Sequence, residues 1–116
     1  MEHKVIDKQV ADHYIWGAGC DSWVLTESAG LSVKQERMPS GTKEQLHFHV
    51  LAQQFFYVLT GCATFYIDRE PYFVSALQGI AISPSVNHYI ANETTTDIEF
   101  LVISQPSTMG VRVNVQ

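Results

Sequence analysis

The feature that most constrains the fold of this chain is the regular spacing of its turn-forming residues. Short β-prone runs are broken by Gly, Pro, Ser and Asn at intervals of roughly 8–12 residues. After Trp23 no segment shows the 3.6-residue period of an amphipathic helix, so alternating strand–helix units are excluded and a sandwich or barrel is favoured. Near the N-terminus, Ile6, Val10 and Tyr14 are spaced four apart, which would also fit a short helix. We predict ten strands, at 22–27, 31–38, 45–50, 54–60, 62–67, 72–74, 79–82, 88–91, 97–104 and 111–115.

Length and composition fit one folded domain. The 116 residues are 46% hydrophobic and 16% charged, which argues against disorder. A net charge of −5 gives no reason to bind nucleic acid or an anionic membrane, and no apolar run approaches the roughly 20 residues that span a bilayer. The charged N-terminus is unlike a signal peptide, so we expect a cytoplasmic protein in which Cys20 and Cys62 stay reduced.

A pair of histidines carries the first chemical signal. His47 and His49 flank Phe48 within the strand predicted at 45–50. Because successive side chains of a strand point to opposite faces, the two imidazoles share one face and can bind one metal ion. Glu44 is not an obvious fourth ligand, because strand parity would place it on the face opposite His47; the alternative is that it lies in the preceding loop.

The spacing around this pair is specific. Gly41 precedes His47 with five residues between them, Gln54 follows His49 after four residues, and Gly61 follows Gln54 after six. These spacings resemble the first motif of the cupin superfamily: Gly, five residues, His-x-His, three or four residues, Glu, six residues, Gly. The one departure is Gln54, which stands where that family has Glu.

A second, looser likeness lies further along the chain. The second cupin motif reads Gly, five residues, Pro-x-Gly, two residues, His, three residues, Asn. His88 and Asn92 fall in place, whereas Ser83 and Ser85 stand at the Pro and Gly positions. The leading Gly of the motif would fall on Leu77, with Gly79 two positions late.

The resemblance implies an all-β fold, a single-domain cupin jelly-roll β-barrel (double-stranded β-helix). We expect the barrel to span residues 21–116, with residues 1–20 as an N-terminal segment packing on the barrel or on a dimer partner. By the same resemblance, one divalent transition metal ion (Zn, Ni, Fe, Cu or Mn) would be held inside the barrel. Carried over, its ligands would be His47, His49, Gln54 and His88.

The neutral amide of Gln54 bears on the chemistry of this predicted site. It can offer only its oxygen, so a divalent ion would keep its full charge and favour an anionic ligand; the alternative is that Gln54 hydrogen-bonds a bound water instead. Phe56 shares the face of Gln54 and could line a substrate pocket or belong to the core. Arg37 would become an anion clamp if its strand face turns inward, and would otherwise be solvated.

Three possibilities stay open from the sequence, and one of them is a metal-free structural barrel. Another is a metal-dependent enzyme of oxygenase, isomerase or lyase type, acting on a small polar or anionic organic molecule. The third is a non-catalytic module that binds a small molecule or a metal. In each case we expect a homodimer, because exposed strand edges need cover.

Overall fold

Eleven strands and no helix form in the part of the chain that the computed structural model describes, residues 3–108 and 112–115. The strands are β1 (Asp12–Trp16), β2 (Cys20–Glu27), β3 (Ser32–Met38), β4 (His47–His49), β5 (Gln53–Thr60), β6 (Cys62–Ile67), β7 (Glu70–Ser75), β8 (Gly79–Ile82), β9 (His88–Ala91), β10 (Ile98–Gln105) and β11 (Arg112–Asn114).

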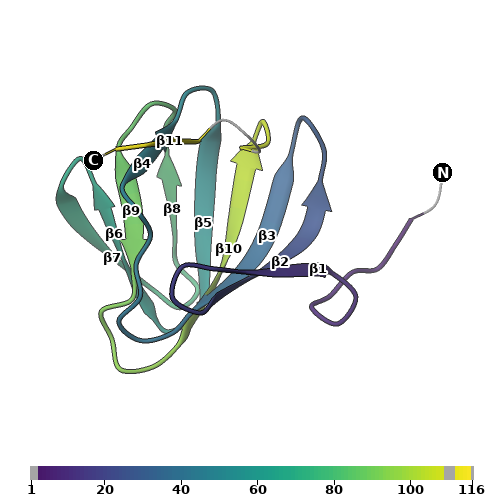
Figure 1. The fold of residues 1–116 in the computed structure, drawn as a ribbon, viewed down its shortest axis with the longest axis horizontal. Helices are drawn as coiled ribbons and strands as arrows, with labels where there is room; N and C mark the ends of the chain where they lie inside the picture. Colours follow the sequence, from purple (N-terminus) through teal and green to yellow (C-terminus); the bar gives the residue numbers. More distant parts are fainter. Residues whose placement is uncertain (1–2, 109–111, 116) are drawn as a thin grey trace.

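The strands form two antiparallel sheets that enclose one barrel (Figure 1). One sheet has six strands in the order β1-β2-β3-β10-β5-β8, and the other has five in the order β11-β4-β9-β6-β7. Strands that are distant in sequence are therefore neighbours in space: β3 lies beside β10, and β4 lies beside β9. This topology confirms the all-β jelly-roll prediction.

The core lies between the two sheets and is built by strand alternation. Along β10, every second side chain from Ile98 to Ser104 is buried. Phe56 of β5 packs on Phe65 of β6 and on Phe100 of β10, with ring centroids 4.9 and 6.0 Å apart. Phe65 and Phe100 are fully buried, and burying such rings contributes the largest share of the hydrophobic stabilisation.

The glycine that closes the first motif is required by a turn. Gly61 connects β5 to β6 at a φ of +83°, a left-handed conformation that L side chains rarely adopt. A Cβ added there would lie 2.7 Å from Cγ2 of Ile98 and 3.0 Å from the carbonyl oxygen of Asp97. Any other residue would therefore clash with the chain at the start of β10.

The asparagine that closes the second motif has a structural role. Asn92 is almost fully buried, and its amide nitrogen donates to the carbonyl oxygens of Met38 and Thr96, each at 2.8 Å. Its side-chain oxygen accepts from the backbone N–H of Thr94 at 3.0 Å, and its own carbonyl accepts from the N–H of Gly41 at 2.9 Å. These bonds tie the end of β3 to the β9–β10 connection.

The N-terminal region contains a strand that the sequence did not predict. Residues 12–16, expected to lie in a segment packing on the barrel, pair with β2 as an edge strand of the six-stranded sheet. No helix forms over Ile6 to Tyr14. The last predicted strand, 111–115, corresponds to β11, and Val111 itself lies outside the described residues. Cys20 and Cys62 are both free thiols, and no described helix could cross a membrane.

Candidate metal centre

Two adjacent strands bring three histidines together inside the barrel. His47 and His49 lie on β4 and share one face, and His88 on β9 is the direct cross-strand partner of His47. All three side chains are buried, with at most 6% of each residue exposed. One ring nitrogen from each lies within 4.8 Å of the others, so the cluster could hold a metal ion. The ring centroids of His47 and His88 are 4.4 Å apart.

Backbone hydrogen bonds fix the tautomers of two of these rings. Nδ1 of His47 donates to the carbonyl oxygen of Gln45 at 2.7 Å, and Nδ1 of His88 donates to that of Val86 at 2.9 Å. In the neutral imidazole the lone pair is then on Nε2, which is the arrangement that metal-binding histidines use. Nδ1 of His49 is buried and has no hydrogen-bond partner among the described residues.

Gln54 completes the cluster from the opposite sheet. Its side-chain nitrogen donates to Oγ of Ser104 at 3.0 Å, which turns its oxygen toward the histidines. That oxygen, Oε1, lies 3.1 Å from Nε2 of His88. Since Nδ1 of His88 already carries the proton, two acceptor atoms face each other at this point. A cation between them would satisfy both lone pairs, so the donor set fits a metal ion.

Burial keeps the three imidazoles neutral. It lowers the pKa of His47 from 6.5 to about 3 and that of His49 to about 4, and it also lowers the pKa of His88. The hydrogen bonds to the carbonyls of Gln45 and Val86 oppose this shift at His47 and His88 without cancelling it. Because only a neutral imidazole can bind a metal, protons compete weakly for these ligands at neutral pH.

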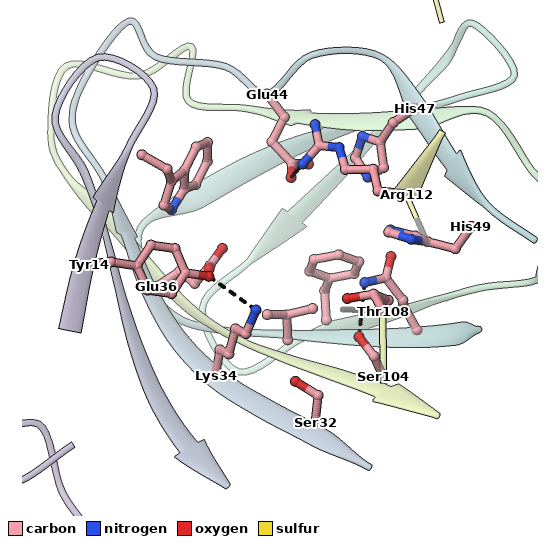
Figure 2. A pocket seen from close by; sticks show the side chains of 14 residues that line it. Tyr14, Ser32, Lys34, Glu36, Glu44, His47, His49, Ser104, Thr108 and Arg112 are labelled. Carbon is pink, nitrogen blue, oxygen red and sulfur yellow. Dashed lines mark hydrogen bonds and ion pairs between the residues drawn. The ribbon is translucent and has the colours of Figure 1, made fainter. Parts of the chain in front are cut away.

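A cavity of about 320 Å³ opens beside the cluster (Figure 2). His47, His49, Gln54 and Phe56 line it together with Tyr14, Trp16, Ser32, Lys34, Glu36, Glu44, Val102, Ser104, Thr108 and Arg112. Phe56 therefore serves both the core and the cavity wall, being 3% exposed.

Arg37 lies outside this cavity. Its Nε donates to Asp21 at 2.6 Å and its Nη1 to Asp97 at 2.9 Å, so two carboxylates on the outer side of the sheet neutralise it. Strand parity correctly grouped Gln35 and Arg37 on one face, but that face points away from the barrel interior. Glu36, the residue between them on β3, faces inward instead and lines the cavity.

Of the two placements expected for Glu44, the structure shows the loop before β4, from which Glu44 lines the same cavity as His47. Parity holds only within a strand, and β4 begins at His47. Glu44 belongs to the preceding connection, where its N–H donates to the carbonyl oxygen of Ile90 at 2.9 Å and its Oε1 accepts from the N–H of Ile90 at 3.1 Å. It is not a member of the three-histidine cluster.

Three charged residues of the cavity wall were not predicted from the sequence: Lys34, Glu36 and Arg112. Lys34 and Glu36 alternate with Arg37 on β3, so the same period-two pattern would have found them once the inward face was known. Arg112 comes from β11, which pairs with β4 opposite His49. Nothing in the local sequence indicates that pairing.

The fold and the site together define a class: a small antiparallel β-barrel with a buried three-histidine cluster and a cavity beside it. The cupin domain family model matches residues 34–104, which is more than half of the chain. The chain belongs to the cupin family. The uncharacterized protein MJ1618 of Methanocaldococcus jannaschii is 29% identical over 75 residues, covering 65% of this chain and 60% of that protein.

Solved structures share the fold at low sequence identity. The polyketide cyclase RemF from Streptomyces resistomycificus has a TM-score of 0.85 at 16% identity, covering 99% of this chain and 87% of that one. A predicted oxalate decarboxylase from Thermotoga maritima has a TM-score of 0.82 at 17% identity, covering 90% of this chain and 100% of that one. A sugar phosphate isomerase from Silicibacter pomeroyi has a TM-score of 0.80 at 18% identity, covering 90% of this chain and 76% of that one.

Proposed function

We propose that this protein is a metal-dependent enzyme that acts on a small anionic organic molecule. The ion would be held by His47, His49, His88 and the amide oxygen of Gln54. The observation that carries the proposal is a pair of buried acceptor atoms beside the histidine cluster: Nε2 of His88 and Oε1 of Gln54 face each other at 3.1 Å, and the ring proton of His88 is on Nδ1. Such a pair is costly to bury without a cation.

The ligand types narrow the choice of ion and its chemistry. Imidazole nitrogens suit Zn, Ni, Fe, Cu or Mn, whereas Mg and Ca require more oxygen ligands. When bound, the ion would supply Lewis-acid polarisation of a carbonyl or would activate oxygen, and neutral ligands would leave its full charge available.

The charge of the cavity favours an anion. Lys34 and Arg112 are the cations of its wall, and Glu36 and Glu44 are its carboxyl groups. Burial raises the pKa of both carboxyl groups, so they offset the two cations only in part, and a divalent ion would add to the positive charge of the occupied cavity. A volume of about 320 Å³ suits a small molecule. The isomerase, the predicted decarboxylase and the cyclase that share this fold are described as enzymes, which supports catalysis over simple binding.

Metal analysis tests the proposal. Protein purified without a nickel column should contain close to one transition metal ion per chain, and His49→Ala should lose it. His13→Ala is the matched control: His13 lies on β1, pairs with Asp21 and is not part of the cluster, so this variant should keep the metal. Equal metal content in all three proteins would contradict the proposed site.

A non-catalytic binding module is the second candidate, and the neutral Gln54 favours it because the site lacks a carboxylate ligand. Retained metal and tight ligand binding without turnover would select this function.

We also propose that the protein is a cytoplasmic homodimer without nucleic-acid or membrane partners. The support is the net charge of −5 and the edge strand β1, where Ile15 is 65% exposed and Tyr14 is 42% exposed. Edge strands of this kind usually need cover. Light scattering across a concentration series should give the mass of two chains, and the mass of one chain throughout would contradict the dimer.

A further inference from the structure

We propose that Glu44 is the proton-transfer residue of the cavity, taking a proton from a carbon atom next to a carbonyl group in a ligand bound beside the histidine cluster, and returning it. This inference rests on the proposed function and extends it by naming a residue and a substrate class, the small 2-oxo acids.

The position of Glu44 is rigid. Two hydrogen bonds join it to one residue of β9, since its N–H donates to the carbonyl of Ile90 and its Oε1 accepts the N–H of Ile90. Ile90 is two residues from His88 on the same strand, so β9 holds both the Glu44 carboxyl group and one histidine of the cluster in place. A residue that transfers a proton needs this kind of fixed geometry relative to the bound ligand.

One oxygen of the carboxyl group is free to react. Oε1 is occupied by Ile90, whereas the nearest cation to Oε2 is Nη1 of Arg112 at 4.0 Å, beyond hydrogen-bond distance. The side chain is 13% exposed, and its exposed part faces the cavity. Figure 2 shows the Glu44 carboxyl group across the cavity from Ser104, with His49 to one side. A ligand lying against the cluster would thus present its other side to Oε2.

The charges around Glu44 suit proton exchange near neutral pH. Burial, and then the charge of Glu36, raise the pKa of Glu44 to about 7, while Arg112 and the Ile90 N–H oppose the rise. The other titratable groups on the cavity wall are Lys34, which hydrogen-bonds Tyr14, and the neutral imidazoles of His47 and His49. A bound divalent cation would lower the pKa of Glu44 and leave more of it ionised, ready to accept a proton.

The proposed step balances without an added oxidant or reductant. The C–H bond next to the carbonyl breaks and its proton moves to Oε2 of Glu44. The C–H electron pair forms a carbon–carbon double bond, and the carbonyl π pair moves to oxygen, giving an enolate. Return of a proton from Glu44 to carbon restores the 2-oxo acid. Lys34 and Arg112 provide positive charge on the cavity wall for the substrate carboxylate.

The first test needs no metal and no substrate. In protein labelled with ¹³C at the glutamate carboxyl carbon, the signal that disappears in Glu44→Gln belongs to Glu44. In metal-free protein this signal should titrate with a midpoint near 7, well above the ordinary value of 4.5. Glu70→Gln, on the exposed strand β7, is the matched control and should leave the titration of Glu44 unchanged. A midpoint near the ordinary value would overturn the proposal.

The second test follows hydrogen exchange of the methyl group of pyruvate in D₂O by proton NMR, with Zn²⁺-loaded protein. The parent and Glu70→Gln should exchange at equal rates, and Glu44→Gln should be slower by at least about 100-fold, the usual contribution of a general base. The amide of Glu44→Gln can still accept the Ile90 N–H, and this variant should keep its zinc. Exchange at the parental rate in Glu44→Gln, or no exchange by the parent, would overturn the inference. Zinc binding and exchange at the parental level in His49→Ala would instead overturn the proposed function.

Discussion

Acid should destabilise the metal-free protein through its buried histidines, and His49 gives the cleanest case. Its pKa is about 4 in the folded chain, against an ordinary value of 6.5, and burial is the main cause. Between these two pH values the unfolded chain binds more protons than the folded one, so the free energy of unfolding falls as the pH is lowered. The interval is about 2.5 pH units, and at about 1.4 kcal/mol per unit the full loss from His49 alone is about 3.5 kcal/mol.

Urea unfolding of the parent and of His49→Asn, both with a chelator, measures this effect. Glu44 acts in the opposite direction, because its raised folded pKa stabilises the protein as the pH falls through about 7. Subtracting the variant from the parent removes the contribution of Glu44 and leaves that of His49. The difference should shift by roughly 2–3 kcal/mol against the parent between about pH 7 and about pH 4.5. A difference that stays constant over this range would refute a buried, neutral His49.

Three further predictions follow from the contacts of single residues. Gln54→Glu should tighten divalent metal binding by at least about tenfold, because a charged oxygen replaces a neutral one beside His88, whereas Gln54→Ala should weaken metal binding. If calorimetry gives the parental metal affinity for both variants, Gln54 is not a ligand. Phe56→Ala should lower the free energy of unfolding by about 3–5 kcal/mol in urea titrations, because the ring packs on Phe65 and Phe100, and a loss below about 1 kcal/mol would show that Phe56 is not a core residue. Arg37→Met should leave calorimetric ligand affinity unchanged and cost about 1 kcal/mol or less of stability, since its ion pairs are outside the cavity; a large loss of ligand affinity would return Arg37 to the site.

Strand positions were largely predictable from the sequence because turns and alternation are local properties. The run from Cys62 to Ile67 was predicted with the same bounds that β6 has, since Gly61 and Asp68 mark its ends. β1 escaped prediction because its residues are almost all exposed and show no alternation of apolar and polar side chains. Only pairing with β2 makes this segment a strand, and pairing is a tertiary property.

The candidate site was predictable in part, for a related reason. The shared face of His47 and His49 follows from parity within one strand, but the approach of His88 depends on pairing between β4 and β9 and was reached through the family motif. For β3, parity separated the two faces correctly without indicating which of them is inside, so Arg37 was proposed in place of Glu36. For Glu44, the sequence left the strand and the loop open, because parity does not extend past the start of β4.

X-ray absorption spectroscopy of the metal-loaded protein tests the central claim most directly, because it reports the atoms around the ion. We expect three imidazole nitrogens and at least one oxygen at about 2.0–2.2 Å in the Zn²⁺ form, with one imidazole lost in His88→Ala. A first shell of oxygens alone, or a parental spectrum unchanged by His88→Ala, would contradict a metal centre built on His47, His49 and His88.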